Sequence, residues 1–157
     1  MEKETGIDNS DKPQFRMQKM YVKDLSYENP NAPQVFVMPT NSDPAVDVNL
    51  QLKNKKIDDD NWEVSLQITA KVSSKEEKKV LFILEIEHAA IFMLKNIPEE
   101  HMPMLLGVDC PTLLFPFTRQ IVSQVSLDGG FVPFLMEPVN FMGLFQSSQQ
   151  KEVGKSN

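Results

Sequence analysis

The stretch VDVNLQLKNKKIDDDNWEVSLQITAKV, residues 46–72, carries the hydropathy pattern that decides the fold. Its first eight residues alternate apolar with polar side chains, and so do residues 62–72. A period of two is typical of a strand with one buried face. The intervening NKKIDDDN has the composition of a turn, so the stretch predicts a β-hairpin. The apolar positions are Val46, Val48, Leu50 and Leu52 in the first strand and Trp62, Val64, Leu66, Ile68, Ala70 and Val72 in the second.

Two further segments predict strands on either side of this pattern. Residues 80–88 also alternate, with Phe82, Leu84 and Ile86 on one face and Ile83, Glu85 and Glu87 on the other. Residues 15–28 alternate as well, but the apolar positions change parity at Met20 and return to it at Leu25. Such a change of phase indicates a β-bulge or a strong local twist.

After Leu94 the pattern becomes helical, with prolines between the helices. A short helix is predicted from about Pro98, where proline suits the first helical position. The main helix begins near Cys110, and Gly129 with Gly130 can supply its left-handed stop. It holds apolar residues at steps of three, four and four, namely Leu114, Phe117, Ile121 and Val125.

Prolines raise one question about this main helix. Pro111 fits its first turn, whereas Pro116 lies five residues further in and either kinks the helix or begins it. A last helix is predicted after Pro138, with Phe141 and Phe145 four residues apart. Because the strands come first and the helices follow, the fold class is α+β: a four-stranded antiparallel sheet, a long central helix and a shorter C-terminal helix.

The composition predicts one folded domain with two polar tails. The chain has 157 residues, of which 41% are hydrophobic and 24% are charged, as in ordinary globular domains. Residues 1–13 and 147–157 hold too little apolar surface to offset their ordering entropy. We therefore expect disordered tails at 1–13 and 147–157 around a folded domain at 14–146.

Charge and cysteine content limit the class of partner and the compartment. The net charge of -6 disfavours nucleic acid and anionic membrane, which attract basic surfaces, and favours a basic partner. Cys110 is the only cysteine, so the chain can form no internal disulfide and no cysteine-rich metal site. The first residues lack an apolar signal region, and the apolar runs are shorter than the roughly 20 residues that span a bilayer. These features predict a cytoplasmic protein without membrane insertion.

The sequence contains few candidate catalytic residues. The candidate bases are His88 on a strand and His101 in a loop, and no serine lies in a GxSxG context. Asp58, Asp59 and Asp60 lack the alternating spacing and the glycine of a calcium loop and are read as a solvated turn. We therefore predict a protein that is not an enzyme, with no catalytic residue, no metal and no cofactor.

Two features point towards binding, although each has an ordinary structural explanation. The chain contains nine methionines and ten phenylalanines, which suit either a surface for varied apolar partners or a core. Asp24 and Glu28 share one strand face, and Glu85 and Glu87 are presented by another strand. If these strands share a sheet, the result is either an acidic docking face or an ordinary solvated face.

Three long motifs together resemble the SecB family of bacterial protein-export chaperones. They are YVKDLSYENPNAP at 21–33, AAIFMLKNIPEE at 89–100 and CPTLLFPFTRQIVSQVSLDGGFVPFLMEPVNFMGLF at 110–145. The resemblance implies a cytosolic homotetramer, a dimer of dimers, with the sheets outside and the long helices at its centre. It also implies that the protein holds unfolded precursor proteins and delivers them to SecA without a cofactor.

The same resemblance implies two sets of site residues. Those expected to bind the basic, zinc-containing C-terminal tail of SecA are Asp24, Glu28, Ile83 and Glu85. Those expected to line a client-binding groove are Val46, Val48, Leu50, Phe82 and Phe141. Relatives often carry a tryptophan just before the second strand, where this chain has Asn41, Ser42 and Asp43, so the groove is expected to be less aromatic there.

Two alternative functions stay open at this point. Within the family, the protein could be a SecB-like chaperone for a single client such as an antitoxin. From another class, it could be a small oligomeric ligand-binding or enzymatic α+β protein. The acidic residues Asp24, Glu28 and Glu85 favour the export role.

Overall fold

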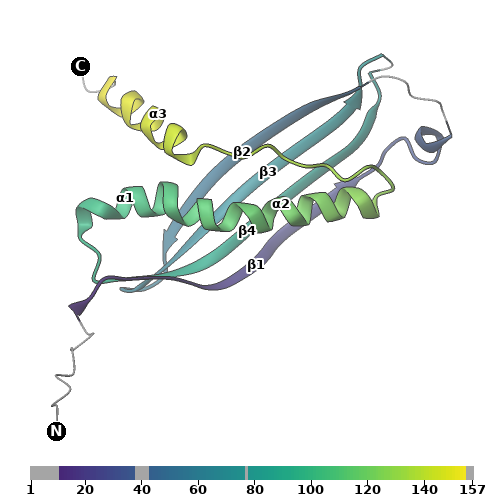
Figure 1. The fold of residues 1–157 in the computed structure, drawn as a ribbon. Helices are drawn as coiled ribbons and strands as arrows, with labels where there is room; N and C mark the ends of the chain where they lie inside the picture. Colours follow the sequence, from purple (N-terminus) through teal and green to yellow (C-terminus); the bar gives the residue numbers. More distant parts are fainter. Residues whose placement is uncertain (1–10, 38–42, 77, 155–157) are drawn as a thin grey trace, which may run out of the picture.

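The computed structural model describes residues 11–37, 43–76 and 78–154 (Figure 1). Four strands form one antiparallel sheet in the order β1-β4-β3-β2: β1 (Gln14–Glu28), β2 (Pro44–Lys56), β3 (Asn61–Ser74) and β4 (Val80–Lys95). They are followed by α1 (Met102–Met104), a π-helical turn η4 (Leu105–Asp109), α2 (Cys110–Asp128) and α3 (Phe141–Gly154). Short 3-10 turns, η2 (Gln34–Phe36) and η3 (Glu99–His101), lie in the connections. The predicted α+β fold is confirmed.

The hairpin of β2 and β3 forms as predicted. Its register pairs Leu52 with Leu66 and Val48 with Ala70, so the apolar positions share one face. In the turn, the Asp58 side chain accepts hydrogen bonds from the backbone N–H groups of Asp60 and Asn61, both at 2.9 Å. Asp58 is therefore a turn residue. Among the residues described, no group of three or more acidic, histidine or cysteine side chains could hold a metal ion.

Strand β1 contains two irregularities where its apolar pattern changes phase. Its register against β4 shifts between Met17 and Lys19 and again between Val22 and Asp24. The predicted β-bulge is thus confirmed at two places. Each bulge inserts an extra residue and resets which side chains face the core, so apolar residues stay on the inner face along the whole strand. Those opposite inner residues of β4 are Phe15, Met17, Met20, Val22, Leu25 and Tyr27.

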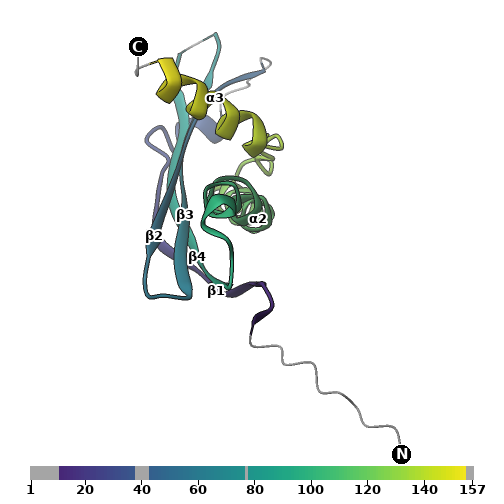
Figure 2. The ribbon, with the colours of Figure 1, turned by 90° about the vertical axis from the view of Figure 1, so that its left-hand side faces the viewer.

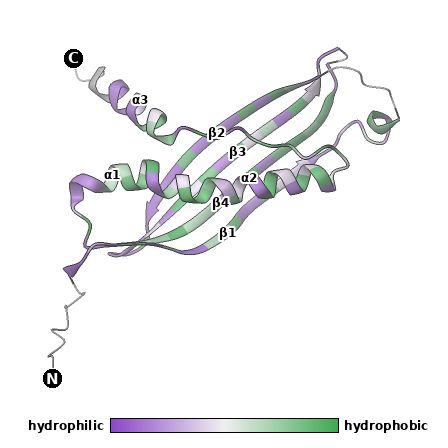
Figure 3. Ribbon diagram, viewed as in Figure 1, coloured by the Kyte–Doolittle hydropathy of each residue, from purple (hydrophilic) through white to green (hydrophobic). Residues whose placement is uncertain are grey.

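Helix α2 packs across one face of the sheet, which we call the inner face (Figure 2). The core lies between them and contains Leu66 and Ile68 of β3, Leu84 and Phe92 of β4 and Leu114 of α2. Hydrophobic and hydrophilic residues alternate along the strands, as expected for a sheet with one buried face (Figure 3). No helix in the described part of the chain covers the opposite, outer face.

The buried side of α2 differs from the predicted apolar stripe. Leu114 is buried, but Phe117 is 41% exposed and Ile121 and Val125 are only partly buried. The residues that face the sheet at steps of four are Leu114, Thr118, Val122 and Ser126. The two polar members have hydrogen-bond partners, because Thr118 contacts His88 of β4 and Ser126 binds the backbone of Phe134. The buried face therefore differs from the predicted stripe and contains two polar side chains that are hydrogen-bonded.

Pro116 lies inside α2 and does not begin it. The helix is continuous from Cys110, and α1 and η4 join it directly, so the predicted short helix merges with the main one. The exposed position of Pro116 lets water satisfy the carbonyl that loses its backbone partner. At the other end the backbone of Gly130 has a φ of 92°, which confirms the predicted left-handed stop.

Helix α3 packs on the first part of the long helix through its two phenylalanines. Phe141 meets Phe115 of α2 edge to face, with ring centroids 6.0 Å apart. Phe145 lies against Gly107 of η4, where an added Cβ would come within 2.9 Å of its ring. The helix continues to Gly154, past the predicted domain end at residue 146. The predicted tail at 1–13 lies outside the described residues, apart from its last three positions.

Candidate functional site

Acidic side chains of β1 and β4 meet on the outer face. The register pairs Asp24 with Glu87, Ser26 with Glu85 and Glu28 with Ile83. Directly paired residues of neighbouring strands project from the same face of a sheet. The four residues expected to contact SecA therefore lie together in three consecutive rows, with Glu87 beside them. We call this group the acidic face: Asp24, Glu28, Ile83, Glu85 and Glu87.

A shallow hollow of about 230 Å³ lies in the acidic face. Its carboxylates come from Asp24, Glu85 and Glu87. Amide and hydroxyl side chains complete its polar lining from β2 and β3, namely Asn49, Gln51, Gln67 and Thr69. Carboxylate and amide oxygens accept hydrogen bonds, so the hollow suits the ammonium or guanidinium group of a basic partner.

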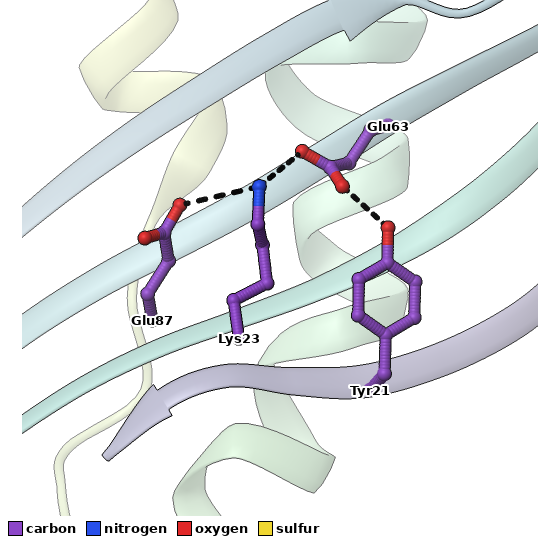
Figure 4. A network of polar contacts seen from close by, with 4 residues as sticks. All are labelled: Tyr21, Lys23, Glu63 and Glu87. Atoms are coloured by element: carbon purple, nitrogen blue, oxygen red, sulfur yellow. Dashed lines mark hydrogen bonds and ion pairs between the residues drawn. The ribbon is translucent and has the colours of Figure 1, made fainter.

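A polar network lies at the edge of this hollow (Figure 4). The Lys23 Nζ atom donates to Glu63 Oε1 at 3.0 Å and lies 3.9 Å from Glu87 Oε1. The Tyr21 hydroxyl donates to Glu63 Oε2 at 2.5 Å. This bond and the nearby lysine lower the pKa of Glu63, whereas burial and the Glu63 contact raise the pKa of Tyr21 to about 12. Glu63 is therefore a charged anchor for both side chains.

Sequence reasoning did not identify this network. Glu63 occupies a polar position of the predicted hairpin, and nothing in that alternation marks it as a partner of a residue 40 positions away. The alternation predicts only that Glu63 projects from the outer face. Its contact with Lys23 depends on the strand order and on the bulge after Val22.

Aromatic side chains from four elements gather at the inner face, near the end of α2. Phe82 of β4 lies 5.2 Å from Phe131, 5.9 Å from Tyr27 and 6.3 Å from Phe134, measured between ring centroids. Phe36 of η2 lies 5.1 Å from Phe131. These five rings form what we call the aromatic cluster.

The glycine pair after α2 makes room for this cluster. A Cβ on Gly129 would lie 2.0 Å from the hydroxyl oxygen of Tyr27, which donates a hydrogen bond to the Gly129 carbonyl at 3.4 Å. A Cβ on Gly130 would lie 3.0 Å from the ring of Phe36. The two glycines therefore end the helix and also allow the cluster to close over that end.

An apolar pocket of about 300 Å³ opens beside the aromatic cluster. Two of the predicted groove residues, Val46 and Phe82, line it. The remaining lining comes from the ends of β2, β3 and β4 and from the segment after α2, and consists of Pro44, Val72, Ser74, Leu81, Phe131, Val132, Pro133, Phe134 and Leu135. Sequence reasoning missed the contribution of residues 131–135, although the apolar run FVPFL after the glycine pair was a usable signal.

The other predicted groove residues lie outside the pocket lining. Val48 is 40% exposed on the same inner face of β2, and Leu50 packs partly buried against the core. Phe141 is 3% exposed, because it packs on Phe115. Asp43 is described, whereas Asn41 and Ser42 lie outside the described residues, so the structure does not place the missing aromatic position.

Comparisons with known proteins give one consistent result. Residues 8–152 match the family described as Preprotein translocase subunit SecB. The chain is 66% identical over 149 residues to the Protein-export protein SecB of Desulfotalea psychrophila, with 95% of each chain covered. It is 46% identical over 143 residues to the protein of the same name from Magnetococcus marinus, covering 91% of this chain and 89% of the relative.

The fold is also similar to that of a solved structure. It is a SecB-like chaperone of Mycobacterium tuberculosis in complex with a peptide from an antitoxin, and it matches with a TM-score of 0.65 over 80% of this chain and 90% of that chain. The sequence identity is 13%, so this likeness concerns the fold alone. None of the described helices is long and apolar enough to cross a membrane.

Proposed function

This chain belongs to the SecB family of protein-export chaperones, which are not enzymes, and we propose that it binds unfolded precursor proteins in the cytoplasm, keeps them competent for translocation and delivers them to SecA. The observation that carries this proposal is the acidic face on the outer side of the sheet. It occurs in a chain that is 66% identical to a Protein-export protein SecB. Its charges fit a basic docking partner, and the apolar pocket on the inner face fits unfolded clients.

Clients bind at the apolar pocket and along the inner face of β2. Apolar surface gains roughly 25 cal/mol for each Å² removed from water, whatever the client sequence. The proposed groove consists of Val46, Val48, Leu50 and Phe82, extended by Phe131 and Phe134. Phe141 contacts a client only if α3 moves away from Phe115, because its ring is buried there.

Self-association into a homotetramer provides several such grooves for one client. Exposed apolar side chains support this self-association. Leu113 and Phe117 project from α2 away from the sheet and are 44% and 41% exposed. Val22 and Leu25 of β1 are both 43% exposed on the inner face. Several weak grooves engaged by one long chain raise the overall affinity through effective concentration.

SecA docks through its basic, zinc-containing C-terminal tail on the acidic face. Asp24, Glu28 and Glu85 supply the charges, and Ile83, which pairs with Glu28, supplies an apolar contact. Within the described residues, neither Asp24 nor Glu85 forms an ion pair or a side-chain hydrogen bond. Their charges are therefore available to a partner, and salt should weaken the contact by screening them within about 10 Å at 0.1 M.

The double substitution Asp24→Asn with Glu85→Gln tests the docking site. Both changes keep the side-chain shape and remove the charge, so we expect SecA binding to fall by at least about tenfold in a titration calorimeter. Binding of a reduced, unfolded protein and suppression of its aggregation should stay unchanged. Undiminished SecA affinity would sink this assignment.

A matched control separates a local effect from a general loss of negative charge. Glu99→Gln with Glu100→Gln removes two exposed carboxylates of η3 and should leave SecA binding unchanged. The same measurements decide the alternatives. A chaperone for one client such as an antitoxin need not bind SecA, and a ligand-binding α+β protein would not suppress the aggregation of unfolded proteins.

A further inference from the structure

We infer that Lys23 is an internal counter-ion of the acidic face, positioned by Glu63 and Tyr21, and that it limits the affinity of this face for basic partners. The inference deepens the proposed SecA contact and rests on it. It rests on three observations: the bulge in β1, the two distances from the lysine ammonium and the partial burial of Glu63.

The bulge brings a cation into an acidic surface. An unbroken strand would send Lys23 and Asp24 to opposite faces, because side chains alternate. Here the register shifts between Val22 and Asp24, so Asp24 pairs with Glu87 while the Lys23 side chain also reaches outer-face residues. The lysine and the aspartate therefore stand next to each other on one face.

The two distances show which carboxylate holds the lysine. The ammonium donates a hydrogen bond to Glu63 at 3.0 Å, whereas Glu87 lies 3.9 Å away. The lysine thus leans towards β3 and only partly offsets the charge of Glu87 (Figure 4). Within the described residues, Lys23 forms no ion pair with Asp24 or Glu85.

Glu63 is fixed in turn by Tyr21. Its side chain is 18% exposed, and the Tyr21 hydroxyl occupies the carboxylate oxygen that Lys23 does not use. The hydrogen bond to this fixed carboxylate restrains the Lys23 side chain, whose four-carbon stem is otherwise flexible. If the Glu63 charge is removed, the Lys23 ammonium becomes free to turn towards Glu87 and Asp24. Glu63 is therefore a positioning residue, which keeps the counter-ion at the edge of the site.

Two substitutions should change SecA binding in opposite directions. Lys23→Gln removes the counter-ion, so we expect SecA to bind about three- to tenfold more tightly at low salt, with a steeper salt dependence. Glu63→Gln releases the counter-ion into the site, so we expect binding about two- to threefold weaker and less dependent on salt. A merely structural role predicts that both variants lose affinity together.

Controls make the result specific. Lys53→Gln removes an equal charge from the outer face of β2, at a position without an ion pair among the described residues, and should change the affinity much less than Lys23→Gln. Unfolded-protein binding and melting temperature, measured for every variant, identify misfolded proteins. Equal effects of Lys23→Gln and Lys53→Gln, or loss of affinity in Lys23→Gln, overturn the inference.

A second probe separates this inference from the proposed function. A short oligolysine peptide, titrated against the same variants, reports the charge of the acidic face without SecA. If wild-type protein does not bind SecA, the proposed function fails, while tighter peptide binding by Lys23→Gln still supports the counter-ion. If SecA binds and neither probe responds to Lys23→Gln, only the counter-ion is rejected.

Discussion

A buried histidine joins the sheet to the long helix. His88 of β4 is 2% exposed, and its Nδ1 atom lies 2.7 Å from the hydroxyl oxygen of Thr118 on α2. The same hydroxyl also lies 3.3 Å from the Leu114 carbonyl oxygen, and the tautomer of the imidazole sets the direction of the His88–Thr118 hydrogen bond. This candidate base thus holds two elements together, and burial lowers its pKa.

This histidine should make stability depend on pH. In the unfolded chain His88 takes up a proton below a pH of about 6.5, whereas the folded protein resists protonation to a lower pH. Titration of His88 should therefore leave the unfolding free energy unchanged above a pH of about 6.5. Below it, the unfolding free energy should fall as the pH drops towards the pKa of His88 in the folded protein, by at most about 1.4 kcal/mol per pH unit. Urea denaturation across this range measures it.

Two variants check the assignment to His88. His88→Gln should lose most of the pH dependence in this window, while His101→Gln, at an exposed site in η3, should keep it. The assignment is wrong if His88→Gln retains the wild-type slope.

At the scale of elements, a buried hydroxyl helps to hold the segment between α2 and α3. Ser126 of α2 is fully buried, donates to the Ser123 carbonyl at 2.8 Å and accepts from the backbone N–H of Phe134 at 2.8 Å. Phe131 and Phe134 of this segment line the apolar pocket. The serine therefore fixes the pocket wall to a helix that the sheet supports.

Ser126→Ala should loosen that wall. The substitution leaves the Phe134 N–H without its acceptor, which costs about 1–3 kcal/mol of folding free energy for a buried group. We expect a lower unfolding free energy and weaker binding of unfolded clients, with SecA binding unchanged. Ser123→Ala keeps the carbonyl that Ser126 uses and is the matched control. Unchanged client affinity in Ser126→Ala would show that the segment does not shape the groove.

At the scale of the whole molecule, the sheet separates the two proposed contacts. The acidic face lies on its outer side and the apolar pocket on its inner side, so a client and SecA can engage one subunit together. The face of α2 that carries Leu113 and Phe117 turns away from the sheet and is the subunit contact that we propose.

Light scattering should find a mass about four times the 17.9 kDa of one chain. Phe117→Glu places a charge in the proposed subunit contact, which burial disfavours, so we expect a smaller assembly. Ile57→Glu adds the same charge in the β2–β3 turn, where the side chain is 50% exposed, and should leave the mass unchanged. A monomeric wild-type protein, or a tetramer that tolerates Phe117→Glu, would contradict this prediction.

Local patterns in the sequence determined the elements of this protein. The alternation at 46–72 gave the hairpin, the change of phase in residues 15–28 gave the bulges, and Gly129 with Gly130 gave the helix end. The motifs identified the family, and the resemblance indicated the acidic residues Asp24, Glu28 and Glu85. The register of β1 and β4 brings these residues together. These features depend on neighbours within a few residues, where backbone geometry and side-chain periodicity act directly.

Only the tertiary structure decided which surfaces meet. The side of α2 that it buries includes Thr118 and Ser126, which contact His88 and the backbone of Phe134. It also brought Lys23 to Glu63, 40 residues away, and placed residues 131–135 beside Phe82. These contacts depend on strand order and packing between segments distant in sequence, and no local period in the chain encodes them.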